Sequence, residues 1–90
     1  MPKIREVTFK SISPFYEWEK SGDKPFTFRK IDMGDRRFYD LGKFTATSRL
    51  TIKIINPANG ESFERKVTGV EYLKRCPNWM VIYWEHKEDL

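Results

Sequence analysis

The sequence has little cysteine or histidine, with one residue of each, and it has no long apolar run. A single cysteine, Cys76, excludes a disulfide within the chain and a cluster of thiolate metal ligands, and it is typical of a reducing compartment. The N-terminal residues lack the apolar run of a signal peptide, and no segment approaches the length of a membrane span. We therefore expect a cytoplasmic protein with no cofactor, no metal and no membrane partner.

The chain is also short. Its 90 residues predict one domain over 1–90 with a modest core. Aromatic residues make up 16% of the chain, so a few large rings are expected to supply much of the buried area. Lysine and arginine outnumber aspartate and glutamate by 17 to 13, which gives a formal net charge of +4. This charge permits a polyanionic partner without requiring one. The charged tail over 86–90 is expected to be frayed.

Short segments with alternating apolar residues predict a mainly β (α+β) protein. Strands are expected over residues 4–9, 25–31, 44–55, 62–67 and 79–84. The turn at Asn56–Gly60 joins the third and fourth of these into an antiparallel hairpin. The last strand is apolar on both faces, which indicates an interior position in the sheet. Several short antiparallel strands with one early helix favour a small, partly closed antiparallel β-barrel.

One short helix is expected over 14–20, ahead of the second strand. A serine–proline pair marks its start, and Gly22 supplies its stop. Phe15 and Trp18 lie three residues apart and are expected to share one face of the helix. The two other expected connections are a polar loop over 32–37 and a single helical turn over 70–75.

The segment Gly22-Asp23-Lys24-Pro25-Phe26-Thr27-Phe28-Arg29 is the most informative part of the chain. Because strand side chains alternate between faces, its two phenylalanines are expected to anchor in the core, while Thr27 and Arg29 face a cavity. Lys24 lies in the turn just before. An ammonium, a hydroxyl and a guanidinium on one turn and strand suit an oxygen-rich, planar or anionic ligand. The alternative is that Lys24 is a solvated turn lysine and that Arg29 pairs with a surface aspartate.

The spacing Gly22-x-Lys24-x-x-Thr27-x-Arg29 resembles the signature of ASCH domains, which belong to the PUA-like β-barrel superfamily. The resemblance implies RNA binding or RNA-linked regulation. Some small members of that family are amidohydrolases that remove the acetyl group from N4-acetylcytidine with the motif lysine, the motif threonine and a later glutamate. The resemblance therefore implies catalytic roles for Lys24 and Thr27, with Glu71 as a positional candidate for the glutamate. The chain departs from the family pattern at Gly42-Lys43, where the family often has Gly-Asp.

Basic and aromatic residues gather after the motif strand. Arg36 and Arg37, with Lys43 near in sequence, are expected to contact phosphates, and Tyr39 is expected to stack on a base. Together with Arg29 they form the predicted ligand-binding set. The alternative is a solvated loop whose charges simply face water.

Three functions are consistent with these residues. The leading hypothesis is a small RNA- or nucleotide-binding domain whose pocket surrounds the motif. The second is an N4-acetylcytidine amidohydrolase, in which Lys24 is nucleophile or general base, Thr27 orients the water or the substrate, and Glu71 shuttles protons. The third is a small phage-type or regulatory module that binds another protein. The sequence leaves the oligomeric state open.

Overall fold

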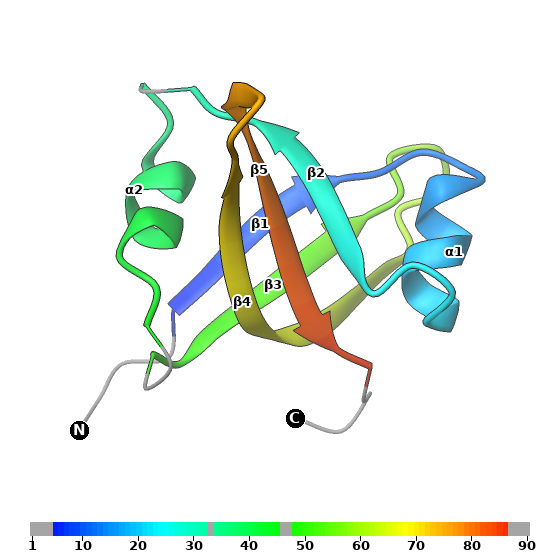
Figure 1. The fold of residues 1–90 in the computed structure, drawn as a ribbon. Coiled ribbons are helices and arrows are strands. Elements are labelled where there is room, and N and C mark those ends of the chain that lie inside the picture. The colour runs from blue at the N-terminus through cyan, green and yellow to red at the C-terminus, as the bar shows by residue number, and fades with distance from the viewer. Residues whose placement is uncertain (1–4, 33, 46–47, 87–90) are drawn as a thin grey trace.

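The computed structural model describes residues 5–32, 34–45 and 48–86, and its main element is one five-stranded sheet (Figure 1). The strands are β1 (Arg5–Lys10), β2 (Phe26–Lys30), β3 (Leu50–Ile55), β4 (Ser62–Leu73) and β5 (Cys76–Glu85). Their order across the sheet is β1-β3-β4-β5-β2. β1 runs parallel to β3, whereas the pairs β3–β4, β4–β5 and β5–β2 are antiparallel.

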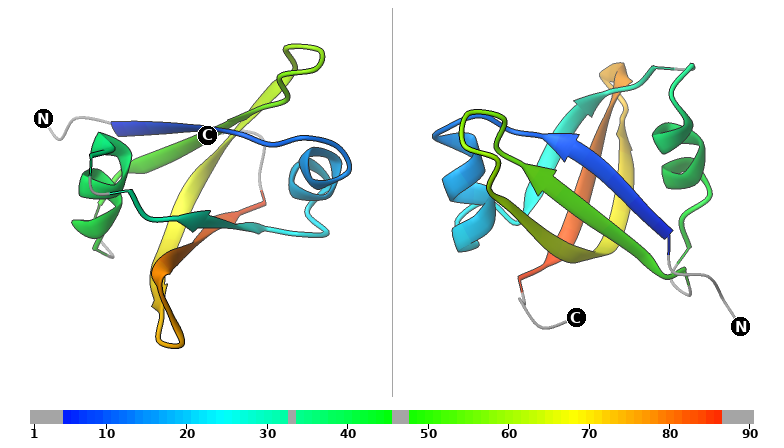
Figure 2. Two further views of the ribbon diagram at one scale, coloured as in Figure 1. Left: turned by 90° about the horizontal axis from the view of Figure 1, so that it is seen from above. Right: turned by 180° about the vertical axis from the view of Figure 1, so that it is seen from behind.

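The sheet curls until its two edge strands, β1 and β2, approach each other (Figure 2). Arg29 on β2 donates from Nη1 to the backbone carbonyl of Lys10 on β1 at 3.0 Å, so its side chain crosses the seam between the two edges. The expected partly closed β-barrel is confirmed as a half-barrel, with one parallel pair in the sheet. The helices α1 (Phe15–Ser21) and α2 (Arg36–Gly42) lie at opposite ends of it (Figure 1). Neither of these described helices has the length and apolar character that a membrane span requires.

The concave face of the half-barrel holds the hydrophobic core. In β3, alternate residues are buried, as their apolar pattern predicted. β5 lies between β4 and β2, so its expected interior position is confirmed. The strands and α2 contribute the following buried side chains to the core: Val7, Phe9, Phe38, Leu41, Leu50, Ile52, Ile54, Phe63, Val67, Met80, Ile82 and Trp84.

The helix α1 forms where the sequence predicted it, but it buries a different face. Gly22 ends the helix in a left-handed conformation with φ of 92°, which glycine adopts without a steric penalty. Phe15 and Trp18 are each 46% exposed, and the buried residues are Tyr16 and Glu19. Phe15 and Trp18 do share one face, with ring centroids 5.6 Å apart, but that face is not the buried one. Tyr16 is buried instead, because its ring packs against Phe63 of the core, at 5.4 Å between centroids.

The alternation expected in β2 is correct, but the two faces are exchanged. Thr27 pairs with Ile82 of β5 and is buried in the concave face, whereas Phe28 is 48% exposed on the convex face. Burying Thr27 and Arg29 is tolerable because their polar atoms bond to each other, with Nε donating to Oγ1 at 3.1 Å. Phe26 and Phe28 pack edge to face outside, at 5.5 Å between ring centroids. The phenylalanines therefore do not anchor in the core, and the polar residues line the inside.

The C-terminal hairpin is longer than the sequence indicated. The single helical turn expected over 70–75 is wrong, because β4 continues to Leu73 and β5 already begins at Cys76. Val70 pairs with Ile82 of β5 in this extension, so the segment is held by cross-strand contacts rather than by helical ones. The tail residues 87–90, expected to be frayed, lie outside the described part of the chain.

The polar loop expected over 32–37 contains the start of a helix. Asp35 accepts a hydrogen bond from the backbone amide of Arg37 at 2.9 Å and so caps the first turn of α2. The strand expected from residue 44 begins only at Leu50, and residues 46–47 lie outside the described ranges.

Candidate ligand-binding pocket

The three motif side chains line one pocket between α1 and β2, with a volume of about 320 Å³. Thr27 and Arg29 reach it from the concave face of β2, and Lys24 from the turn that precedes this strand. Glu19 enters from α1. The structure therefore brings an ammonium, a hydroxyl and a guanidinium together, as the motif predicted, and adds a carboxyl group that the sequence did not reveal.

Lys24 turns inward because its backbone and its ammonium are both tied to α1. Its amide donates to the Trp18 carbonyl at 3.0 Å, which holds the turn against the end of the helix. Its Nζ lies 2.9 Å from Glu19 Oε2 in an ion pair. The same Nζ lies 5.5 Å from the centroid of the Phe15 ring and 5.7 Å from that of Phe26. Lys24 is thus a partly buried pocket residue and not a solvated turn lysine.

Glu19 contributes to the pocket a carboxylate that can accept a further hydrogen bond. Its side chain is only 1% exposed, and Oε2 takes the Lys24 bond. Among the described residues, Oε1 has no hydrogen-bond partner. A buried polar atom without a partner costs about 1–3 kcal/mol. The pocket is therefore prepared to accept a hydrogen bond from an N–H or O–H group.

Arg29 forms a fixed wall of the pocket. Besides its bonds to Thr27 and to the Lys10 carbonyl, it donates from Nη2 to Ser11 Oγ at 2.8 Å. Its guanidinium also lies 4.8 Å from the centroid of the Phe9 ring. Burial lowers the pKa of Arg29, and the charge of Glu19 acts in the opposite direction. Several contacts from different elements thus hold one cation in a single orientation.

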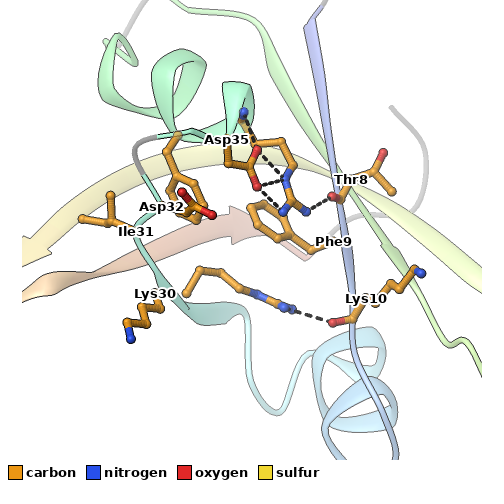
Figure 3. Close-up of a pocket in the computed structure, with 10 residues that line it drawn as sticks. Thr8, Phe9, Lys10, Lys30, Ile31, Asp32 and Asp35 are labelled. Atoms are coloured by element: carbon orange, nitrogen blue, oxygen red, sulfur yellow. Dashed lines mark hydrogen bonds and ion pairs between the residues drawn. The ribbon is translucent and has the colours of Figure 1, made fainter.

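A second hollow, the seam cleft, shares Arg29 and Lys10 with this pocket and has a volume of about 1000 Å³ (Figure 3). Arg37 points into it from α2, donates to the Thr8 carbonyl at 2.6 Å and binds the Asp35 carboxylate through Nε at 2.9 Å. This hydrogen bond lowers the pKa of Asp35, and Asp35 in turn raises the pKa of Arg37. The Phe9 ring lies between the two guanidiniums, 4.3 Å from that of Arg37. Arg29 and Arg37 are therefore brought together, as expected for a shared ligand.

The remaining predicted ligand-binding residues lie elsewhere. Tyr39 and Lys43 border a third hollow beside α2, where the Lys43 ammonium lies 4.0 Å from the centroid of the Tyr39 ring. A hydrogen bond from Lys43 lowers the pKa of Tyr39. Arg36 is exposed at the start of α2 and borders none of these three hollows.

Glu71 does not reach Lys24. It pairs with Val81 of β5, which in turn pairs with the outward-facing Phe28 of β2. Directly paired side chains share a face of the sheet, so Glu71 lies on the convex face, opposite Thr27. There it accepts a hydrogen bond from the Tyr83 hydroxyl at 3.3 Å.

The glutamate beside Lys24 is Glu19, which lies five residues before it in the chain. The signal that pointed to it was weak. Glu19 falls three residues after Tyr16 and so shares its helix face, but the choice of that face depends on packing against Phe63. Among the described residues, no group of three or more histidine, cysteine, aspartate or glutamate side chains is placed to hold a metal ion.

Together these features define a small half-barrel with a polar pocket beside a cation-lined cleft. Comparisons with protein-family models, with curated proteins and with solved structures find no match for the chain. The resemblance to ASCH domains stays a prediction that rests on the motif spacing.

Proposed function

We propose that this protein is an ASCH-like domain that binds RNA or a nucleotide-like ligand in the pocket around Lys24. The observation that carries the proposal is the convergence of Lys24, Thr27 and Arg29 on one concave space. This space opens beside a cleft that holds a second arginine, Arg37. Donors and an acceptor at the bottom of the pocket match the polar edge of a nucleobase, and cations nearby match phosphate.

Titration with short single-stranded RNA and with free nucleosides at low ionic strength tests this proposal. We expect saturable binding that weakens as salt rises, because phosphate contacts release counterions. Thr27→Val removes the pocket hydroxyl with little change of volume and should weaken binding about tenfold, the worth of one or two hydrogen bonds. The exposed Lys66→Ala serves as the control and should change binding little. Well-folded protein that binds neither RNA nor nucleosides even at low salt contradicts the proposal.

A second candidate function, hydrolysis of N4-acetylcytidine, is favoured by one observation. Glu19 Oε2 lies 2.9 Å from Lys24 Nζ, so a carboxylate stands beside the motif lysine and threonine. In this reaction water adds to the acetyl carbonyl, the bond from that carbon to N4 breaks, and one proton of the water passes to N4. Glu19 would take the proton from water through its free oxygen, and Lys24 would return one to N4. Thr27 would orient the water or the substrate.

The hydrolase candidate predicts conversion of N4-acetylcytidine to cytidine and acetate. Glu19→Gln keeps the shape of the side chain but cannot take a proton, so it should lower the rate about 10²–10⁴-fold. Glu64→Gln, an exposed change on β4, is the matched control and should leave the rate unchanged. Chromatography of the reaction products is the measurement. No conversion by folded protein, or equal rates for Glu19→Gln and Glu64→Gln, removes this candidate.

A further inference from the structure

Arg29 is a wall shared by the Lys24 pocket and the seam cleft. It lines both hollows, and so does Lys10, whose carbonyl it binds. Its hydrogen bonds to Thr27 and Ser11 fix it in this position. A ligand that fills both hollows must therefore pass directly beside one rigid guanidinium. Because the two hollows share Arg29 and Lys10, they adjoin, and a ligand that reaches past Arg29 contacts both.

The Lys24 pocket suits the uncharged, planar part of such a ligand. Glu19 borders it, and among the described residues its buried Oε1 has no hydrogen-bond partner, so it can accept from an N–H donor that reaches it. Lys24 and Arg29 supply donors for the acceptor atoms of a base. Ile12, which is 61% exposed, and the half-exposed Phe15 and Phe28 also line the pocket. A heterocyclic base has apolar faces that stack on such rings and a polar edge that bonds to such groups. The pocket thus offers a base both stacking surface and hydrogen-bond partners.

The seam cleft suits the anionic part. Arg29 and Arg37 line it, and so do Lys10 and Lys30 of the two edge strands, whose ammonium groups point away from the cleft in Figure 3. Two carboxylates, Asp32 and Asp35, offset this charge in part. Asp35 forms an ion pair with Arg37 that neutralises both charges, and it caps α2. Four cationic and two acidic side chains line the cleft, so it keeps a net positive charge, and a phosphate attached to the base would fall next to Arg29.

We infer that the ligand is a nucleotide rather than a nucleoside, with its base in the Lys24 pocket and its phosphate in the seam cleft. The inference rests on the proposed function and adds that the phosphate is part of what the protein recognises. A free nucleotide and one unit of a single-stranded RNA present the same chemistry to the two subsites.

Calorimetric titration of the full chain separates the two parts of the ligand. The probes are the four ribonucleosides, their 3′- and 5′-monophosphates, inorganic phosphate and a single-stranded RNA tetranucleotide. We expect at least one monophosphate to bind about tenfold or more tightly than its own nucleoside, which corresponds to one charge-assisted hydrogen bond. A tetranucleotide that binds more tightly still identifies RNA as the source of the phosphate, whereas equal affinity identifies a free nucleotide.

Two sets of variants assign the subsites. Arg37→Gln should reduce monophosphate affinity several-fold and leave nucleoside affinity unchanged, because Arg37 lines the seam cleft and not the Lys24 pocket. Arg75→Gln removes the same charge from an exposed position in the turn between β4 and β5, and serves as the control. Phe28→Ala, which removes an exposed rim residue, should weaken nucleoside and monophosphate binding by the same factor.

Equal binding of nucleosides and monophosphates overturns the inference and leaves the proposed function in place. An equal loss of monophosphate affinity in Arg37→Gln and Arg75→Gln also overturns it, because the effect then comes from overall charge. If no nucleoside, nucleotide or RNA binds, the proposed function fails and the inference fails with it.

Discussion

At the scale of single residues, the central feature is the pair formed by Lys24 and Glu19. Glu19 is almost wholly buried, and Lys24 is the residue that compensates its charge, at 2.9 Å. A buried carboxylate is stable only when it is paired and hydrogen-bonded. The same contact that stabilises the fold therefore places a cation and an anion in the pocket, so binding and stability are linked at this point.

This link predicts a specific pattern of stability changes. Lys24→Met leaves Glu19 buried without its cation and should lower the free energy of unfolding by about 1–3 kcal/mol. Replacing both residues, as Lys24→Met/Glu19→Leu, removes the unpaired charge and should recover most of that loss. Urea unfolding of the wild type, both single variants and the double variant measures the coupling. Additive losses would show that the pair contributes nothing beyond its separate members.

At the scale of elements, two features of α2 explain why it forms although its sequence resembles a polar loop. Asp35 caps the first turn, and its carboxylate also binds the Arg37 side chain. Phe38 and Leu41 then lie on the buried face of this seven-residue helix. The cap and the buried apolar face together stabilise this segment as a helix, although its charged residues alone predicted a solvent-exposed loop.

The cap makes α2 sensitive to acid. Because the folded state lowers the pKa of Asp35, its contribution is present above the ordinary aspartate pKa and is lost as the pH falls through the folded value. Asp35→Ala should destabilise the protein by about 1 kcal/mol at pH 7. The difference from wild type should shrink when the pH falls below about 4, the ordinary aspartate range.

Thermal unfolding at several pH values is the measurement for α2. Asp23→Ala, an exposed change in the turn after α1, is the control and should stay within about 0.5 kcal/mol of wild type. A difference between wild type and Asp35→Ala that stays constant down to pH 3 would contradict the assigned role of the carboxylate.

At the scale of the whole molecule, the seam determines both the shape and the site. The guanidiniums of Arg29 and Arg37 bind the backbone carbonyls of Lys10 and Thr8 along the free edge of β1. This covers an edge that would otherwise be open to pairing with another strand. It also places the two arginine charges at the seam between the edge strands of the half-barrel, in a molecule whose formal net charge is +4. The salt dependence expected for nucleotide binding arises from this placement more than from the total charge.

The sequence alone determined the elements that depend on local chemistry. The alternation of Leu50, Ile52 and Ile54 predicted a half-buried strand, and Gly22 predicted where α1 ends. The motif spacing also predicted correctly that Lys24, Thr27 and Arg29 share a cavity. The first two features follow from the period of a strand and from the steric freedom of glycine, which neighbours in space do not change. The inward turn of Lys24 depends in addition on its contacts with α1.

The tertiary structure alone decided which face of β2 and of α1 is buried. Both faces of each element carry large side chains, so the sequence did not distinguish them, and the buried face expected for β2 was wrong. Thr27 is buried because the curl of the sheet closes its face against the β1 edge, where Arg29 binds the Lys10 carbonyl while its Nε bonds to the Thr27 hydroxyl. Glu19 lies in the pocket for a similar reason. Its neighbour on the same helix face, Tyr16, packs against Phe63 of β4, and this contact turns that face of α1 inward. Burial is a property of the closed half-barrel, because it depends on partners far apart in the chain.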